Sequence, residues 1–487
     1  MTSTNKIKLG AGVVTLTLTA ALTVPALAAN VPTDRSEAST PAEHFADHNE
    51  LARLHNVLDT KVGQDIRRHG ARVVGDGATD VSEAVSAAVS AAGAGGVVIF
   101  PEGTWRIPIS GRTALNDPPD NQLWMGMGPG TVLKADGPSP DAPLVANGTL
   151  AFVGPGKRLR LANMEVRGPA GAGAFTANGI YHAGGADTGQ VICDRVRFSG
   201  RWPGGAIKTA PAGAGNGNVS RTYVGVHGCE FDLDDGIGIA HNGERGARLL
   251  VDQSVFKRFG RAGSNQYHAV YPRNAVSARI TNTDFIDQLG TGWAIHAFGG
   301  PGSPEYWDVE NVYLGPALHE GVITPAGFTA KLRGITAEAM GAEAVTAQGN
   351  VDVHDSQFRT AAWAAHPIVT FSAPVTIRVF DSTFERNAAV INLAHNGSTA
   401  QLHQCRLPNL AGAASPFALT ATDVNTLRSH IRDCEFSDTA GPGAGPATAR
   451  PAANRAGVGA QYFNTSTGVV NFSDGSGWRN PSGARLP

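Results

Sequence analysis

The sequence predicts an all-β fold, a single-stranded parallel β-solenoid, from one recurring pattern and an unusual composition. A hexad of the form apolar–x–small polar–x–x–apolar recurs along the chain, and its starts lie 21 to 33 residues apart. That spacing suits one coil of three short strands with extra residues in loops. Only 16% of the 487 residues are charged and 61 are glycine, which favours short strands and tight turns over helices. The hexads begin at Leu161, Cys193, Val226, Val251, Ile280, Val309, Leu332, Val353, Val379, Leu402 and Ile431.

Three positions of the hexad carry specific structural expectations. The third is often Asn, Asp or Gly, which predicts a turn residue that bonds its own backbone or adopts left-handed dihedrals. The sixth is often Phe, so we expect phenyl rings to stack from coil to coil inside the core. Cys229, Cys405 and Cys434 share the fourth position, and Cys193 opens its own hexad. Cys405 and Cys434 would be neighbours on successive coils, either as a disulfide or as buried free thiols.

The chain begins with a segment that reads as a secretory signal. Lys6 and Lys8 precede an apolar run at 13–24 and a small-x-small cleavage site at 26–28. The apolar run is shorter than the ~20 residues that a membrane-spanning helix needs. We therefore expect a secreted protein with no membrane attachment after cleavage. The expected segments are a signal peptide (1–29), an N-terminal stem helix (30–68), the solenoid (69–440), a linker (441–456) and a C-terminal β-hairpin module (457–487).

A family resemblance appears where the solenoid begins. The string G-D-G-A-T-D at 75–80 is followed by an alanine-rich helix at 81–92 and by G-G-V-V-I-F-P-E-G-T-W at 95–105. This combination resembles the opening of the pectate-lyase-like superfamily, which implies a right-handed parallel β-helix. A small N-terminal helix can cap such a solenoid by hiding apolar side chains and unpaired strand edges. Gly103 is expected to allow a turn in the first coil.

The two ends of the chain carry a second resemblance. Residues 457–483, with Tyr462 and Trp478, resemble the small β-hairpin module that ends many bacteriophage tail fibres and tail spikes. Residues 45–58, with the pattern D-H-N-x-L-x-x-x-H-N-x-L, are similar to the stem helices of such proteins. This resemblance implies a virion tail as the alternative location and a homotrimer as the candidate assembly.

One inward apolar residue can be recognised in the second strand of each coil. The residues just before it and just after it form two outward columns along the solenoid. The aligned residues are Ile180, Ile207, Ile237, Val270 and Ile295. Small residues precede them, namely Gly179, Ala206, Gly236, Ala269 and Ala294. Mostly large or polar residues follow them, namely Tyr181, Lys208, Gly238, Tyr271 and His296. These columns predict either a shallow sugar-binding groove with a bare floor or small residues packed under a loop.

Asp232, Asp234 and Asp235 stand beside this strip, with His241 and Arg245 just beyond them. Paired carboxylates are what glycoside hydrolysis needs, so the three aspartates and His241 are the candidate catalytic residues. The string D-D-G-I-G-I is similar to the paired-aspartate strand of polygalacturonases. Ordinary turn chemistry is the alternative explanation for this cluster, because Asp is common in turns.

Two eliminative mechanisms stay open beside hydrolysis. The aspartates could bind Ca²⁺ while Lys208, Arg245 or Arg273 removes a proton next to a uronate carboxylate. Alternatively, Tyr271 or His268 could act as the base without a metal. No cofactor is expected otherwise. The candidate substrate-binding residues are Tyr181, Lys208, Arg245, His268, Tyr271, Arg273, Trp293 and His296.

Charge and motifs restrict the partners. A net charge of −2 and the absence of P-loop, zinc-finger or Rossmann spacings argue against a nucleic-acid partner. The sequence therefore predicts an extracellular polysaccharide-binding β-helix, and specifically a depolymerase acting as a glycoside hydrolase or a lyase. A non-catalytic glycan-binding adhesin and a structural phage tail protein are the two alternatives.

Overall fold

The computed structural model describes most of the chain after residue 62. The described residues are 63–70, 75–109, 113–137, 148–170, 177–184, 188–210, 221–243, 245–298, 304–338, 340–359, 366–371, 374–385, 389–407, 417–419, 430–436, 444–445, 447–450, 453, 458–464, 466–467, 469–474 and 476–486. The expected signal peptide, nearly all of the expected stem helix and much of the linker lie outside them. Within the described residues, no helix has the length and apolar character needed to cross a membrane.

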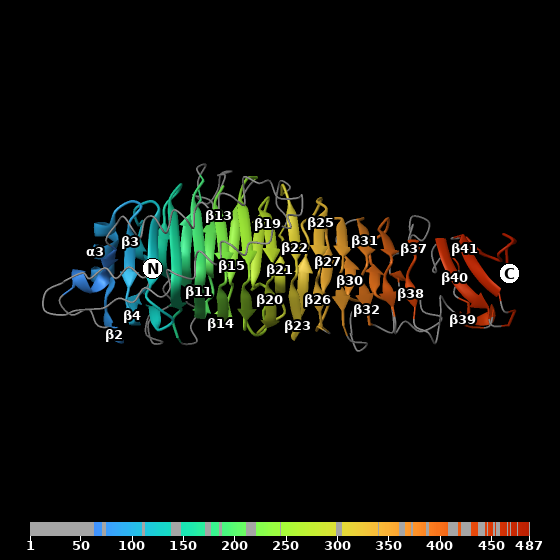
Figure 1. Cartoon of the computed structure of the whole chain (residues 1–487), viewed down its shortest axis with the longest axis horizontal. Helices are drawn as coiled ribbons and strands as arrows, with labels where there is room; N and C mark the ends of the chain where they lie inside the picture. The colour runs from blue at the N-terminus through green and yellow to red at the C-terminus, as the bar shows by residue number, and fades with distance from the viewer. Residues whose placement is uncertain are drawn as a thin grey trace, which may run out of the picture. The chain divides into compact units, whose positions relative to one another are not determined.

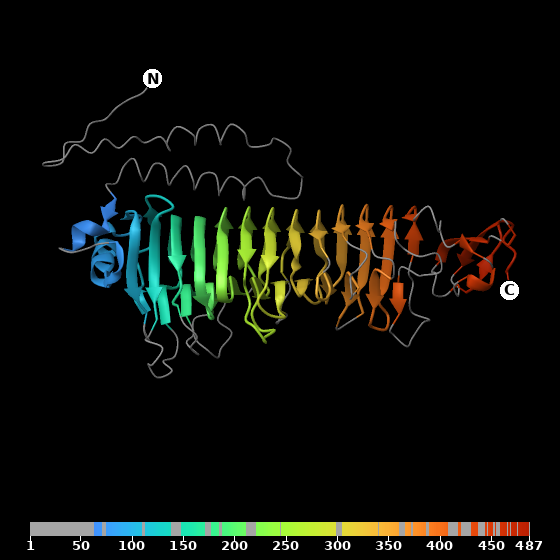
Figure 2. The ribbon, with the colours of Figure 1, turned by 90° about the horizontal axis from the view of Figure 1, so that it is seen from below.

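The chain is a right-handed parallel β-helix, as the hexads and the family resemblance predicted. Its coils stack side by side, each pairing in parallel with the next (Figures 1 and 2). Three ladders of strands run along the stack. The first consists of β1 (Gln64–Asp65), β3 (Val97–Phe100), β6 (Gln122–Gly126), β9 (Arg158–Arg167), β11 (Gln190–Trp202), β13 (Tyr223–His227), β16 (Arg248–Asp252), β19 (Ser277–Thr281), β22 (Trp307–Glu310), β25 (Ala330–Arg333), β28 (Val351–His354), β31 (Thr376–Phe380), β34 (Thr399–His403) and β37 (His430–Arg432).

The long strands β9 and β11 also belong to the second ladder. Its other members are β2 (Asp76–Asp80), β4 (Gly103–Pro108), β7 (Thr131–Asp136), β14 (Glu230–Gly236), β17 (Val255–Lys257), β20 (Asp284–Asp287), β23 (Tyr313–Ala317), β26 (Thr336–Ala337), β29 (Gln357–Phe358), β32 (Thr383–Phe384), β35 (Arg406–Leu407) and β38 (Glu435–Phe436). The third ladder is a separate 12-stranded sheet. It consists of β5 (Thr113–Asn116), β8 (Gly148–Val153), β10 (Ala177–Ala183), β12 (Gly205–Ala210), β15 (Ile239–Gly243), β18 (Val270–Asn274), β21 (Trp293–His296), β24 (Glu320–Ile323), β27 (Val345–Ala347), β30 (Ile368–Thr370), β33 (Ile391–Leu393) and β36 (Phe417–Leu419).

The third hexad position makes the corner between the first and second ladders. In all eleven hexads this residue has a positive φ, between 49° and 62°. Its N–H continues the ladder around the corner; for example, the N–H of Gln253 donates to the Thr281 carbonyl at 3.2 Å and that of Asn282 to the Glu310 carbonyl at 3.0 Å. The predicted role of Asn, Asp and Gly at this position is confirmed. Arg195, Gln253 and Gln404 adopt the same conformation, so the coil imposes it on less suitable residues.

The fourth hexad position explains the cysteines. Here a side chain of one coil accepts the buried backbone N–H of the preceding coil: Ser254 Oγ from Cys229 at 3.2 Å, and Ser382 Oγ from Ser356 at 3.1 Å. Cys434 Sγ accepts in the same way from the N–H of Cys405, at 3.3 Å. All four cysteines are free thiols in this structure; of the neighbouring pair, Cys405 is buried and Cys434 is half-buried.

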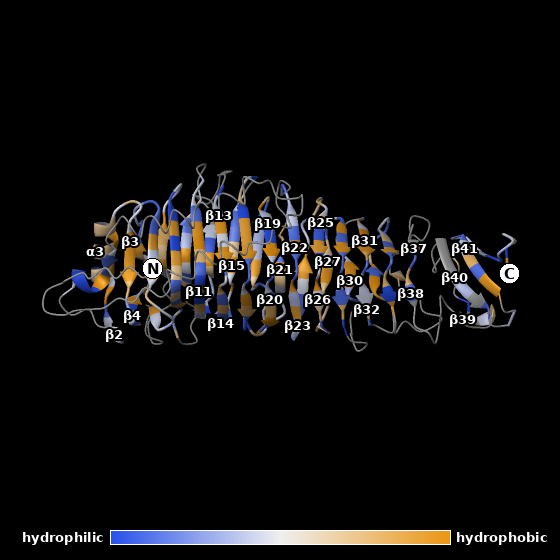
Figure 3. Cartoon of the chain, viewed as in Figure 1, coloured by the Kyte–Doolittle hydropathy of each residue, from blue (hydrophilic) through white to orange (hydrophobic). Residues whose placement is uncertain are grey.

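The sixth hexad position carries the predicted ring stack. Phe198, Phe231, Phe256 and Phe285 are fully buried, with successive ring centroids 5.0, 4.4 and 4.9 Å apart and nearly parallel planes. Apolar residues alternate with polar ones along the strands, as inward and outward side chains of a sheet should (Figure 3). The stack therefore forms part of one continuous core.

The two ends of the described solenoid differ. At the start, α3 (Ser82–Ala92) caps the first coils with buried Ala84, Val85, Ala88 and Val89, which confirms the predicted capping helix. The 3-10 helix η2 (Ile66–His69) packs beside it. Gly103 has φ 132°, and a Cβ there would lie 2.9 Å from the Gly75 Cα, so only glycine fits.

The C-terminal module is an antiparallel sheet. Strands β40 (Val458–Asn464), β41 (Val469–Asp474) and β42 (Trp478–Arg479) pair in sequence, and β39 (Ala444–Gly445) joins β40 in parallel. Ala453, Tyr462 and Trp478 form its small core. The predicted hairpin is present with an additional third strand, and the short 3-10 helix η4 (Ala447–Ala449) precedes it.

The phenyl stack predicts a measurable stability difference. Truncation of Phe256 to alanine opens a cavity between two stacked rings and should lower the free energy of unfolding by about 3–5 kcal/mol. Phe371, which is 57% exposed, provides the control, and its truncation should change stability by about 0.5 kcal/mol or less. Urea unfolding followed by circular dichroism measures both. Equal midpoints for the two variants would contradict a structural role for the stack.

Candidate functional site

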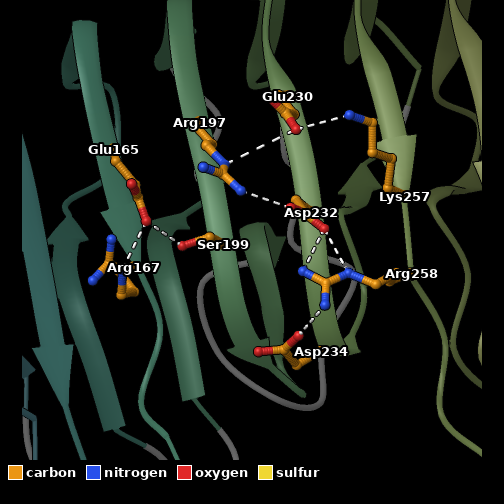
Figure 4. Close-up of polar contacts among 9 residues, drawn as sticks. All are labelled: Glu165, Arg167, Arg197, Ser199, Glu230, Asp232, Asp234, Lys257 and Arg258. Atoms are coloured by element: carbon orange, nitrogen blue, oxygen red, sulfur yellow. Dashed lines mark hydrogen bonds and ion pairs between the residues drawn. The ribbon is translucent and has the colours of Figure 1, made fainter. Parts of the chain in front are cut away.

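Asp232 is held between two arginines on the outer face of the second ladder (Figure 4). Its carboxylate lies 2.7 Å from Arg197 Nη2 and 2.6 Å from Arg258 Nη2. Burial alone would raise the pKa of Asp232, but the hydrogen bonds from Arg197 and Arg258 outweigh it and the pKa is lowered. Asp232 is therefore ionised at neutral pH, with both oxygens occupied.

Asp235 has the same kind of environment, and Asp234 does not. Asp235 is 8% exposed, lies 2.6 Å from Arg201 Nη2 and 2.8 Å from Arg261 Nε. The register between β11 and β14 shifts after Gly200, so that Asp234 is an extra residue in a β-bulge. Its exposed side chain contacts only one arginine, Arg258, at 3.0 Å.

The three aspartates thus belong to a network of ion pairs between successive coils. Glu230 extends this network through Lys257 Nζ at 3.0 Å. Within the part of the chain that the structure describes, no group of three or more His, Cys, Asp or Glu side chains could hold a metal ion. The sequence showed the carboxylates but not their partners, which lie 24 to 35 residues away.

His241 points into the solenoid rather than toward the aspartates. It is fully buried, with Nδ1 2.6 Å from Thr209 Oγ1 and Nε2 3.2 Å from the Arg248 carbonyl oxygen. Burial lowers its pKa to about 4. The structure thus places the ring of this predicted catalytic residue inside the solenoid and not on its surface, and its catalytic role stays a prediction.

The alignment of the third ladder needs one correction. Ile207 pairs with Ile239 rather than Ile237, so Ala240 and not Gly238 follows Lys208 in the outward column. The preceding column becomes Gly179, Ala206, Gly238, Ala269 and Ala294, all of them buried. A Cβ on Gly179 would lie 2.4 Å from the Ala206 carbonyl oxygen. These small residues allow close stacking of coils, and the expected exposed groove floor is wrong.

Large side chains of the third ladder do gather at one place, around β18 and β21. The Tyr271 and His296 rings stack with centroids 4.9 Å apart, and Trp293 lies 4.5 Å from His296. Phe298, which is 45% exposed, meets Tyr271 edge-on at 6.2 Å. We call the surface made by Tyr181, Tyr271, Trp293, His296 and Phe298 the aromatic face.

Cations border the aromatic face on this ladder. The Arg273 guanidinium lies 5.3 Å from the Tyr271 ring centroid and 5.4 Å from that of Phe298. Lys208 Nζ lies 5.9 Å from the Tyr181 centroid, and the Tyr181 ring stacks on Phe152 of the preceding coil. Seven predicted substrate-binding residues thus share one surface or touch it, because His268 contacts Tyr271, Trp293 and His296.

Arg245 is the predicted binding residue that stands apart. It is exposed in the turn between β15 and β16. The aspartates, too, belong to the second ladder, whereas the aromatic face belongs to the third. The structure therefore separates the three predicted catalytic aspartates from most of the predicted binding residues.

Two carboxylates that were not among the predicted site residues lie beside the aromatic face. Glu320, the first residue of β24, pairs in register with Trp293 on β21. Glu343 takes the corresponding place on the next coil, two residues before Val345, which pairs with Val322. Burial, and then the negative charge of Glu343, raise the pKa of Glu320 to about 7 despite an opposing contribution from Trp293. Both glutamates stand two residues before an inward valine, Val322 or Val345, and the alignment could have found them had it been extended.

Comparisons with known proteins add similarity of fold. No protein-family model matches the sequence, and no curated protein matches it. The A-module of mannuronan C-5 epimerase AlgE6 from Azotobacter vinelandii is 14% identical over 77% of this chain and 99% of that one, with a TM-score of 0.36. Tailspike protein 3 of bacteriophage CBA120 is 13% identical over 89% and 71%, with a TM-score of 0.39. PfbA, a surface adhesin of Streptococcus pneumoniae, is 12% identical over 77% and 92%, with a TM-score of 0.45.

The ion-pair network predicts different roles for two neighbouring aspartates. Asp235→Asn should leave Arg201 and Arg261 poorly paired and should cost about 1–3 kcal/mol of stability. Asp234→Asn removes one exposed pair and should cost about 0.5 kcal/mol or less. Urea unfolding of both variants at neutral pH tests this difference. A larger loss for Asp234→Asn would refute the structural reading of Asp235.

The raised pKa of Glu320 predicts a pH-dependent stability. The folded state holds the proton of the Glu320 carboxyl more tightly than the unfolded state does. The stabilisation that this proton provides is fully present below the ordinary pKa of 4.5 and is lost as pH rises through about 7. Glu320→Gln should therefore gain stability relative to the wild type across that range. Urea midpoints at several pH values measure the gain, with Glu310→Gln on the exposed surface of β22 as the matched control. An equal gain of stability with rising pH in both variants would show that Glu320 is not the cause of the pH dependence.

Proposed function

We propose that this protein is an extracellular or virion-associated β-helix that binds a polysaccharide on the aromatic face. The observation that carries the proposal is the gathering of partly exposed rings and cations on β10, β12, β18 and the end of β21 in the third ladder, from Tyr181 to Phe298. The C–H faces of sugar rings pack on aromatic rings, and sugar hydroxyls take hydrogen bonds from nearby polar groups. A chain of sugars can follow strands that repeat along one axis.

The burial pattern supports the same surface. Tyr181, Tyr271 and Trp293 are each partly exposed, so part of each ring is available to a ligand while the rest is fixed by packing. Rings that are already fixed lose little conformational entropy on binding. Phe371 is an exposed apolar residue outside the aromatic face. It lies three coils further along the third ladder, at the position that corresponds to Phe298.

Binding to a glycan panel tests the proposal. The panel contains uronate polymers (alginate, polygalacturonate, hyaluronan), a sulfated polymer (dextran sulfate) and neutral polymers (dextran, galactan). We expect the full chain to bind at least one of them, and expect Tyr271→Ala and Phe298→Ala to weaken that binding by about tenfold or more. Phe371→Ala is the matched control and should bind like the wild type. Equal binding by all variants, or no binding to any polymer, would refute the proposal.

Cleavage of the bound glycan is the second candidate function, and Glu320 favours it. A carboxyl group with a pKa of about 7, beside a second carboxylate and an aromatic ring, is suited to general acid catalysis at neutral pH. If the protein is a glycoside hydrolase, new reducing ends should appear without ultraviolet absorbance from an unsaturated uronate. Glu320→Gln should then lower the rate by about 100-fold or more while binding persists.

Other results of that assay would assign the chemistry elsewhere. Absorbance from an unsaturated uronate would indicate a lyase and would favour Tyr271 as the base. Loss of turnover in Asp234→Asn with unchanged stability would favour the aspartates. Silence on every bound polymer would leave a non-catalytic adhesin or a tail protein, for which a homotrimer is the proposed assembly.

A further inference from the structure

Two cations on the aromatic face lack the carboxylate partners that neighbouring arginines have. Arg197, Arg201, Arg258 and Arg261 all pair with aspartates on the second ladder. Among the residues that the structure describes, no carboxylate lies within 4.0 Å of Lys208 or Arg273. Arg273 contacts aromatic ring faces instead, and burial followed by the charge of Arg273 lowers the pKa of Lys208.

The hydrogen bonds of His268 fix the tautomers of a histidine pair. The backbone N–H of Trp293 can only donate, and it lies 3.1 Å from His268 Nδ1. His268 Nδ1 must therefore be the acceptor, and the proton of the neutral ring is on Nε2. That N–H faces His296 Nδ1 at 2.7 Å, so His296 Nδ1 is also an acceptor. The proton of His296 is consequently on its own Nε2.

This arrangement keeps both rings neutral. Each Nδ1 atom already accepts a hydrogen bond from an N–H group. Protonation of Nδ1 of His268 or His296 would therefore place two N–H groups against each other. Burial lowers the pKa of His268 far below its usual value, and burial followed by the Arg273 charge lowers that of His296 to about 4. At neutral pH, His296 Nε2 carries a hydrogen and has no lone pair to act as a base. Among the described residues, no acceptor lies within hydrogen-bond distance of it.

Lys208, Arg273 and His296 Nε2 offer only donors at this point, whereas Glu320 stands beside Trp293, three residues before His296. His296 stacks on Tyr271, and Arg273 lies over the same tyrosine ring. Lys208 lies in the same outward column as Tyr271, two strands before it. Only the short side chain of Ala240 lies between them in this column. A neutral sugar hydroxyl would use one donor and leave the two cations uncompensated. An oxyanion, such as a carboxylate or a sulfate, accepts from several donors at once and balances the charge.

We propose that Lys208, Arg273 and His296 form an oxyanion-binding subsite, in which His296 is a neutral hydrogen-bond donor and not a general base. The inference rests on the proposed function, because the oxyanion is carried by a unit of the bound polysaccharide. It narrows the ligand to an acidic glycan, whose charged group is a carboxylate or a sulfate ester.

Chemical modification of the ligand tests the subsite. The strongest binder of the glycan panel is compared with the same polymer after carboxyl reduction or desulfation, by calorimetry with the full chain. We expect the anionic form to bind at least about tenfold more tightly than the neutral form, and expect loss on carboxyl reduction or on desulfation to tell which group is recognised. A neutral polymer as strongest binder, or equal binding before and after modification, overturns the subsite and leaves polysaccharide binding intact. Absence of any binding overturns both.

Variants separate the three donors from general attraction between charges. Lys208→Gln and Arg273→Gln should each weaken binding of the anionic form by about tenfold and leave the neutral form unchanged. Lys331→Gln removes the same charge from an exposed position on β25 and is the matched control. An equal effect of all three variants would overturn the subsite, because it would mean that net charge alone governs binding.

His296 has a test that needs no ligand. Nitrogen-15 shifts of the imidazole rings should show His268 and His296 as neutral at pH 7, both with the proton on Nε2. Signals are assigned by their loss in His268→Asn and His296→Phe. His296→Gln, which keeps an N–H at the end of the side chain, should retain more affinity for the anionic polymer than His296→Phe, which keeps the ring stack. A proton on His296 Nδ1, a charged ring, or equal affinities of the two variants would overturn the assigned role.

Discussion

The left-handed residue at the third hexad position is the constraint on which the rest of the molecule depends. It turns the chain between the first and second ladders once per coil while its N–H still bonds to the next coil. Because the corner repeats at the same place, the residues on either side of it are stacked in register. The buried Ser and Cys acceptors and the phenyl stack follow from that register, since each needs the same position on successive coils to coincide.

The hexads were sufficient to predict this part of the fold. Positions three, four and six each have a distinct side-chain requirement, so one pattern specifies both the corner and the core. The third ladder was harder, because Ile237 and Ile239 are two residues apart. A shift of two leaves the inward and outward faces unchanged, and the alternation of apolar residues cannot detect it. The bulge at Asp234 adds one residue just before this strand, and pairing with the preceding coil was needed to find it.

The candidate site shows the same limit from the side of chemistry. Tyr271 and His296 were predicted to bind because outward positions of one sheet come together whenever the coils stack. The environment of a carboxylate depends on residues one coil away. Asp235 meets two arginines there, whereas Glu320 meets another carboxylate. The residues next to each of them in the sequence do not reveal this difference. His241 has the same inward parity as Ile239 under either alignment, so the alternation of the strand already placed its ring inside the solenoid.

The confinement of the aromatic face to a few neighbouring strands has a consequence for how such a protein can change over time. Each coil contacts mainly the coils before and after it, so a coil can be duplicated or lost at a distance without disturbing the face between β10 and β21. The length of the rod and the chemistry of its surface are therefore separately heritable. A lineage could extend the reach of the C-terminal module, or replace it, while the aromatic face stays the same.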